Sequence, residues 1–240
     1  MIFRGVLVVL LCISASSYGY SVLKLQSGMK AIVVLPESYK ETRRYPVLVA
    51  LHGMKENMHL SYRRFKELAN QNNMILLCPE GSDYEKAYLR ESPDDLAQIM
   101  AVYELVLDRY RVDRKKTVLL GFSRGGTIAL ETAMRYPQYF PIAVSMFGFF
   151  NTDEMTTYYR QAPLEIWEKR QVFLITGSTD YSKISMQRAY DFFTQRRISV
   201  QLWSYEGLIH DFPTDFPAQF TQMLEEMRVP KTQILALKNG

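Results

Sequence analysis

The stretch Gly121-Phe122-Ser123-Arg124-Gly125 has the form G-x-S-x-G, in which a serine stands between two glycines. An apolar run, 117–122, precedes this serine, and a helical pattern, 124–136, follows it. A serine at such a strand-to-helix turn takes a strained conformation that lifts its Oγ clear of the sheet, and small neighbours relieve the crowding. The pattern predicts that Ser123 is a nucleophile. The alternative is a structural turn with a capping serine.

A serine nucleophile needs a base, and the sequence offers three histidines. His210 follows the last expected strand, 200–207, where a base can meet Ser123 at the carboxyl edge of a sheet. We interpret His52 as a residue that fixes the loop after its strand. We interpret His59 as an exposed residue of a surface helix, because a lone histidine usually has no catalytic role. His210 is therefore the predicted base.

The base needs an acid that orients it, and Asp180 lies in the loop after the expected strand 171–178. Where a G-x-S-x-G serine follows a strand and opens a helix, the acid and then the base come later in the chain, and Ser123, Asp180 and His210 have this order. Asp153 and Asp211 are rival acids, but neither follows the strand that normally delivers the acid. In this interpretation His210 removes the serine proton, and Asp180 holds the imidazole tautomer.

Backbone N–H groups are needed to stabilise the oxyanion of such a reaction. Arg124 offers one at the start of the helix behind the serine. The loop after the expected strand 46–53 offers a second, for which Gly53 and Met54 are the candidates. We assign the two donors to Met54 and Arg124.

Short apolar runs alternate with helical patterns along the chain. The strands and helices that this alternation predicts must position the serine, the histidine, the aspartate and the N–H donors. Several runs are apolar nearly throughout, as expected for parallel strands that are covered on both faces. The sequence thus predicts an α/β fold with a mostly parallel central sheet and helices on both of its faces. The expected strands are 31–36, 46–53, 74–81, 117–123, 141–148, 171–178 and 200–207. The expected helices lie near 58–72, 92–110, 124–136, 183–197 and 214–228.

The clearest helical pattern is 92–110. Ser92 is its predicted cap, with Pro93 in the first turn. Asp94 and Asp95 favour the positive end of the helix dipole.

Four segments carry a resemblance to a known family: YPVLVALHG, VLLGFSRGG, LITGSTD and GLIHDF. They resemble α/β-hydrolases, and specifically single-domain esterases of the phospholipase/carboxylesterase and dienelactone-hydrolase type. The resemblance spans about residues 30 to 215 and implies the α/β-hydrolase fold. It also implies a carboxylic ester hydrolase with Ser123, Asp180 and His210 as triad, donors near Met54 and Arg124, and neither metal nor cofactor. The chain departs from the family in lacking valine-proline after the aspartate, and in having LIHDF where GHGF is usual.

The leading interpretation is a serine esterase that cleaves small or soluble esters through an acyl-enzyme on Ser123. A serine peptidase or an acyltransferase would use the same triad, so these classes stay open. A non-catalytic binding module on a hydrolase scaffold is a third possibility. Such modules commonly lose a triad member, whereas all three are present here. The connection 147–168, about 20 residues long, is too short for a large lid, which favours small or water-soluble substrates.

Candidates for the substrate pocket are Phe122, Phe147 and Phe149. An apolar wall for an acyl or aromatic group is one interpretation of the aromatic connection 147–168, and ordinary packing is the other. The side chain of Arg124 could attract an acidic substrate, although its slot in the motif needs no particular side chain.

The first 19 residues have the order of a secretory signal: Arg4, an apolar run from Val6, and small residues up to Gly19. We predict a cleaved signal peptide, 1–19, and a single α/β-hydrolase domain, 20–240, in a secreted or periplasmic protein. A lipoprotein anchored at Cys12 and an uncleaved segment are the alternatives. The apolar run is too short to span a bilayer, so we expect no stable membrane span.

The composition is that of a globular protein, with 48% hydrophobic and 22% charged residues. Loss of residues 1–19 removes only Arg4 among charged residues and takes the net charge from +4 to +3. Because the basic runs are short, we expect a small-molecule ester as partner and no nucleic acid. Cys78, within an apolar run, is predicted to be a small buried hydrophobe.

Overall fold

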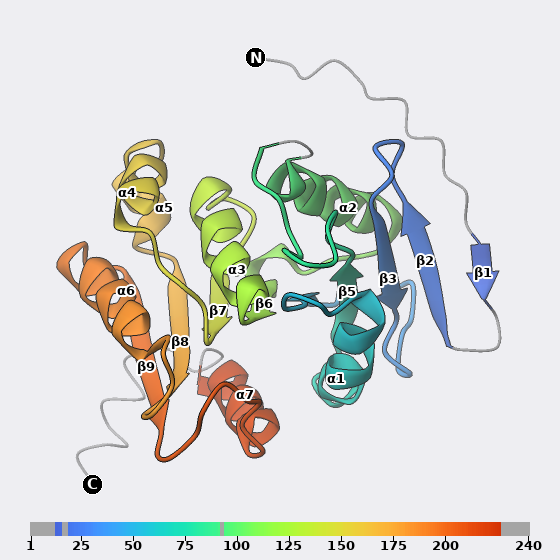
Figure 1. Cartoon of the computed structure of the whole chain (residues 1–240). Helices are drawn as coiled ribbons and strands as arrows, with labels where there is room; N and C mark the ends of the chain where they lie inside the picture. Colours follow the sequence, from blue (N-terminus) through green and yellow to red (C-terminus); the bar gives the residue numbers. More distant parts are fainter. Residues whose placement is uncertain (1–12, 16–18, 92–93, 227–240) are drawn as a thin grey trace, which may run out of the picture. The chain divides into compact units, whose positions relative to one another are not determined.

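A nine-stranded sheet runs through the described part of the chain, in the order β1-β2-β3-β5-β4-β6-β7-β8-β9 (Figure 1). The computed structural model describes residues 13–15, 19–91 and 94–226. From β5 to β9 all neighbouring strands pair parallel, whereas β1, β2 and β3 join the β5 edge antiparallel. The strands are β1 (Ile13–Ala15), β2 (Tyr20–Lys24), β3 (Lys30–Val34), β4 (Val47–Leu51), β5 (Ile75–Pro79), β6 (Val118–Phe122), β7 (Ile142–Met146), β8 (Gln171–Gly177) and β9 (Ser199–Tyr205).

The chain divides into two compact units, one that ends at His210 and one that begins at Asp211. The first unit holds the sheet and its connecting helices. The second holds α7, in which Phe216 packs edge-on against Phe212. The single domain that we predict over 20–240 stays a prediction. The helices are α1 (Met58–Gln71), α2 (Asp95–Arg109), the 3₁₀ turn η1 (Arg114–Lys116), α3 (Arg124–Arg135), α4 (Thr152–Arg160), α5 (Leu164–Trp167), α6 (Lys183–Gln195) and α7 (Phe216–Glu226).

The mostly parallel sheet predicted from the apolar runs is confirmed. All seven expected strands are present with slightly shorter bounds, and every residue of β4, β5, β6 and β7 is buried. The run 31–36 forms β3, which is antiparallel, because the short connection 35–46 holds no helix to carry the chain back for a parallel return. Strand β1 lies within the segment predicted as a signal peptide. Strand β2 and helices α4 and α5 are not among the expected elements, because their sequences mix polar and apolar residues without a clear period.

Alternation along the strands divides the buried side chains between the two faces of the sheet. In β4, Val47, Val49 and Leu51 share one core cluster with side chains of α2, α3 and α6. Leu48 lies between them and is equally buried, but it belongs to the other face. Helix α1 packs against β3, β4 and β5, and Figure 1 shows α1 and α2 on opposite sides of β5. Both faces are therefore covered, and the carboxyl ends of the parallel strands meet at one edge.

Helix α2 begins later than its sequence pattern predicts. Its N-cap is Asp94, whose side chain accepts a hydrogen bond from the N–H of Ala97 at 3.2 Å. The same carboxylate pairs with Arg135 of α3, with Oδ2 2.6 Å from Nη2. The cap predicted at Ser92 is therefore wrong, because Asp94 also gains a cationic partner from α3 that no local pattern reveals. Ser92 and Pro93 themselves lie outside the described residues.

Asp95, in the first turn of α2, is fully buried and ties the preceding loop to the helix. It accepts hydrogen bonds from the N–H of Ser82 at 3.1 Å, the N–H of Leu89 at 2.8 Å and Nε2 of Gln98 at 3.0 Å. The hydroxyl of Ser82 also donates to it. This loop, 82–91, follows the carboxyl end of β5, so the carboxylate of Asp95 fixes a segment that begins at the edge where active groups are expected.

The chain start is described only in part. Strand β1 lies within the predicted signal segment, while residues 1–12 and 16–18 lie outside the described residues, so cleavage stays a prediction. None of the helices in the described ranges is long and apolar enough to cross a membrane. Cys78 is buried in β5, as predicted, and burial raises the pKa of its thiol.

We predict that Asp95→Ala lowers the free energy of unfolding by about 3 kcal/mol, because three backbone or amide donors lose a charged acceptor in a buried site. Urea denaturation measures the change. Asp108→Ala, on the exposed face of the same helix, is the matched control and should change the value by less than about 0.5 kcal/mol. Equal effects of the two substitutions would contradict the role given to Asp95.

Candidate active site

Ser123 stands at a sharp turn between β6 and α3. Its backbone has φ 54° and ψ −121°, a conformation that a residue with a side chain rarely adopts. Its N–H donates to the carbonyl of Met146 in β7 at 2.8 Å. A Cβ on Gly121 would collide with the backbone of Gly125, and one on Gly125 would lie 2.5 Å from the carbonyl oxygen of His52. The glycines of the motif are thus required by close backbone contacts around the serine.

The structure brings Ser123, Asp180 and His210 together, each from the carboxyl end of a different strand. Nε2 of His210 lies 2.8 Å from Oγ of Ser123, and Nδ1 lies 3.0 Å from Oδ2 of Asp180. The other carboxylate oxygen of Asp180 accepts the N–H of Ser182 at 2.7 Å. The Asp180 side chain is only 1% exposed, so its charge is directed at the imidazole. Hydrogen bonds therefore join the serine, the histidine and the acid in one chain.

The rival acids occupy other environments. Asp153 is exposed in the first turn of α4. Asp211 is exposed, and its side chain accepts the N–H of Phe212 at 2.7 Å. Of these three carboxylates, only Asp180 is hydrogen-bonded to His210.

Aromatic rings surround the imidazole of His210. Tyr181 stacks on it, with ring centroids 4.7 Å apart and planes 19° apart. Phe122 and Phe147 contact it at centroid distances of 5.3 and 5.4 Å. These two phenylalanines, which we predicted for the substrate pocket, are buried and do not line the cavity at Ser123. Their rings end the buried strands β6 and β7, so packing draws them against the histidine.

A pocket of about 270 Å³ opens at Ser123. Phe149, the third predicted pocket residue, does line it; its side chain is 50% exposed and stacks on Tyr181 at 5.7 Å. Sequence reasoning missed several of the other lining residues. Tyr181 could have been found from its place beside Asp180, whereas nothing in the sequence connects Arg90 with the serine. The lining residues are Met54, Arg90, Ser123, Arg124, Thr127, Phe149, Phe150, Asn151 and Tyr181.

The loop after β4 is held in place by Glu56. Its Oε2 accepts the N–H of Gly53 at 2.7 Å, and its two oxygens bind the guanidinium of Arg64 at 3.1 and 3.2 Å. Since the Gly53 N–H already has an acceptor, Met54 is the better of the two candidate donors in this loop. Arg124, the other expected donor, is the first residue of α3, where a helical N–H has no carbonyl partner within the helix.

The remaining histidines have structural environments. His52 is buried, with Nδ1 2.9 Å from the carbonyl of Gly53 and Nε2 3.0 Å from the N–H of Gly81, which fits the predicted role in fixing its loop. His59 is half-buried, not exposed as predicted, because Tyr20 of β2 lies against it. In the described ranges, no group of three or more histidine, cysteine or acidic residues is placed to hold a metal ion.

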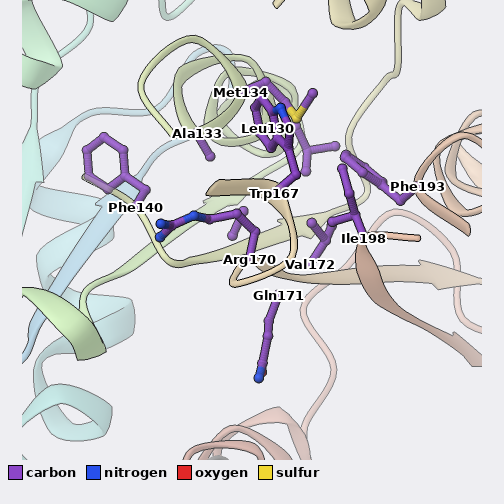
Figure 2. Close-up of a pocket in the computed structure, with 11 residues that line it drawn as sticks. Leu130, Ala133, Met134, Phe140, Trp167, Arg170, Gln171, Val172, Phe193 and Ile198 are labelled. Atoms are coloured by element: carbon purple, nitrogen blue, oxygen red, sulfur yellow. The ribbon is translucent and has the colours of Figure 1, made fainter. Parts of the chain in front are cut away.

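A second, apolar pocket lies apart from the triad, between α3, α5 and β8 (Figure 2). Its volume of about 10 Å³ would hold roughly one water molecule. Trp167, Arg170 and Phe193 are among the residues around it. Arg170 donates to the carbonyl of Ile166 at 3.0 Å, and burial lowers its pKa. This pocket is too small for a substrate.

Family comparison agrees with this geometry. The model of the Esterase family, described as "Putative esterase", matches residues 23–227. The chain belongs to the Esterase family. Its mostly parallel sheet has the α/β-hydrolase fold.

Similar proteins include two named esterases and a serine hydrolase. Feruloyl esterase B of Thermothelomyces thermophilus is 28% identical over 105 residues, which cover 40% of this Esterase-family chain and 36% of that enzyme. The match thus spans little more than a third of that relative. A ferulic acid esterase structure superposes with a TM-score of 0.62 at 18% identity, over 90% of this chain and 96% of that one. The substrate-bound structure of FphF, a fluorophosphonate-binding serine hydrolase of Staphylococcus aureus, gives 0.66 at 16% identity, over 93% and 99%. At these identities the two structures show a shared fold.

We predict that Glu56→Ala lowers kcat/KM for a 4-nitrophenyl ester about tenfold. Loss of the carboxylate frees the Gly53 N–H and Arg64, so the loop that carries Met54 is held less firmly. Glu56→Gln, which keeps an acceptor for Gly53, should retain more activity. Glu67→Ala, on the exposed side of α1, is the control and should stay within about twofold of wild type. Full activity of Glu56→Ala would show that the loop does not depend on this carboxylate.

Proposed function

We propose that this protein hydrolyses carboxylic esters of small or soluble substrates through an acyl-enzyme on Ser123. The observation that carries the proposal is the hydrogen-bonded chain from Ser123 through His210 to Asp180. Family membership supports the reaction class, and the strained serine at the end of β6 supports the nucleophile.

In the proposed first half-reaction, Oγ of Ser123 attacks the ester carbonyl carbon while Nε2 of His210 takes the hydroxyl proton. Asp180, buried and bonded to Nδ1, stabilises the imidazolium that forms. The carbonyl oxygen becomes an oxyanion, for which we assign the backbone N–H groups of Met54 and Arg124 as donors. Collapse of this intermediate breaks the bond to the alcohol oxygen, which leaves with the proton from His210.

The second half-reaction releases the acid. Water takes the place of the alcohol, gives a proton to His210 and attacks the acyl carbon of the ester on Ser123. The carboxylic acid then leaves, and Oγ recovers its proton from the imidazole. In both half-reactions His210 accepts one proton and later donates it, so the protons balance. The proposed cycle uses the three side chains, the two backbone N–H groups and water.

The pocket beside Ser123 supports compact substrates. Its volume of about 270 Å³ fits a small ester better than a long-chain lipid. Exposed rings of Phe149 and Tyr181 form a planar apolar wall on it. The names feruloyl esterase B and ferulic acid esterase belong to relatives that act on esters of an aromatic acid, and this wall supports a planar group in the substrate here as well.

We also propose that the protein is exported, to the periplasm or the medium. The order of residues 1–19, with Arg4 before an apolar run and small residues after it, supports a cleaved signal peptide. Mass spectrometry of the exported protein tests this by its N-terminal residue, and a chain that still begins at Met1 would contradict it.

We expect a fluorophosphonate to form one covalent adduct, on Ser123, because only a serine beside a base is nucleophilic enough. Peptide mass spectrometry identifies the site. Ser123→Ala should lose both the adduct and ester turnover, by at least about 10³-fold, with an unchanged circular dichroism spectrum. Ser178→Ala, at a hydroxyl outside the triad, is the control. An adduct elsewhere, or turnover retained by Ser123→Ala, would remove the nucleophile assignment.

The acid assignment predicts a difference between two neighbouring aspartates. Asp180→Asn should reduce kcat by roughly 10²–10⁴-fold, since the amide cannot stabilise the imidazolium and can impose the wrong tautomer. Asp211→Asn removes an exposed carboxylate next to His210 in sequence and should change kcat by less than about threefold. Steady-state kinetics with one soluble ester compares them. The reverse order of effects would move the acid to Asp211.

A further inference from the structure

The pocket at Ser123 has positively charged side chains in its lining as well as an aromatic wall. Arg90 and Arg124 line it, and both also line an adjoining, wider pocket of about 600 Å³. Met54 is the third residue that the two pockets share. A substrate that extends from the serine into the wider pocket must therefore pass these two guanidinium groups.

The charge of Arg90 is already matched by carboxylates. Its Nε donates to Oε2 of Glu131 at 2.8 Å, its Nη2 also binds Glu131, and its Nη1 lies 3.4 Å from Oε2 of Glu154. Neither carboxylate lines the pocket. Glu131 is almost fully buried, and burial raises its pKa to about 6. Arg90 is thus held as part of the wall by groups behind it.

Arg124 has a different environment. Its Nη2 donates to the backbone carbonyl of Tyr88 at 3.1 Å, which anchors one edge of the guanidinium. No carboxylate in the described ranges lies within ion-pair distance of it. Burial lowers the pKa of this side chain, as expected for a partly desolvated charge. A guanidinium has five N–H donors, so the bond to Tyr88 leaves further donors on a side chain that lines the pocket at Ser123.

We propose that Arg124 binds an anionic group of the substrate, a carboxylate in the simplest case, so that the enzyme prefers negatively charged esters. The inference rests on the proposed function, because it concerns a substrate of the same site. Hydrogen bonds between arginine and a carboxylate are about twice as strong as hydrogen bonds between neutral groups. Since Arg124 directly follows Ser123, such a bond would fix the ester at a set distance from the nucleophile.

The anionic group can belong to the acyl part or to the alcohol part, and two pairs of probes separate these cases. The 4-nitrophenyl monoester of glutaric acid and its neutral methyl ester differ by one charge on the acyl side. The ester 4-acetoxybenzoate and its amide, 4-acetoxybenzamide, differ by one charge on the alcohol side. Within each pair the size and the reacting bond are nearly the same.

The measured quantity is the ratio of kcat/KM for the charged ester to that for the neutral one. We expect wild type to favour the charged member of at least one pair by about 10-fold or more, as for one charge-assisted bond. Arg124→Gln should bring this ratio close to one, and Arg124→Lys should give an intermediate value because it keeps the charge without the planar fork. The ratio cancels any general loss of activity or of folded protein. Arg109→Gln, which removes an exposed charge at the end of α2, should leave the ratio unchanged.

The outcomes separate this inference from the proposed function. If Ser123 is labelled and esters are hydrolysed but both ratios are near one, the inference fails and the function stands. If the preference exists and survives Arg124→Gln, the assignment to Arg124 fails. If no ester is hydrolysed, the function fails. Calorimetric binding of the two glutarate probes to Ser123→Ala protein then decides the inference. The inference requires that this protein binds the charged probe more tightly than the neutral one, and that adding Arg124→Gln abolishes the difference.

Discussion

The site depends on one backbone conformation, that of Ser123 at φ 54° and ψ −121°. Such a conformation costs of order 1–3 kcal/mol and persists only where the surrounding structure holds it. Here the serine N–H is bonded to the carbonyl of Met146 in β7, and α3 begins at the very next residue. Gly126, one residue beyond the motif, lets the helix approach β7, because a Cβ there would lie 2.7 Å from the Met146 carbonyl oxygen. The sheet, the turn and the helix therefore all help to maintain the strained backbone conformation of Ser123.

The same constraint positions the rest of the site. Gly125 lies so close to the end of β4 that the loop with Gly53 and Met54 starts beside the serine. At the end of β7, Phe147 also has a positive φ, 55°, and its N–H is bonded to Ile175 of β8. Its ring contacts the imidazole of His210 edge-on, and Tyr181 stacks on the same imidazole. The imidazole of His210 is thus packed against aromatic rings of residues that follow the ends of β7 and β8.

The sequence predicts the parts of this arrangement that follow from local pattern. Apolar runs identify β3 to β9. The positions of Ser123, Asp180 and His210 after β6, β8 and β9 bring them to one edge of the parallel sheet. What depends on contacts between distant segments is not predictable in this way. The true cap of α2 depends partly on Arg135 of another helix. The aromatic rings divide into pocket-lining and buried ones according to packing, which explains why Phe149 faces the pocket whereas Phe122 does not.

The residue after the nucleophile combines two separable properties. Its backbone N–H belongs to the start of α3 and would serve an oxyanion whatever side chain it carries. Its side chain, by contrast, projects into the pocket, and here it is a guanidinium held by the carbonyl of Tyr88. Loop 82–91, which supplies that carbonyl, is itself fixed by the buried carboxylate of Asp95. Substrate preference can therefore change at this position, or in the loop that orients it, while the geometry of serine, histidine and acid remains intact.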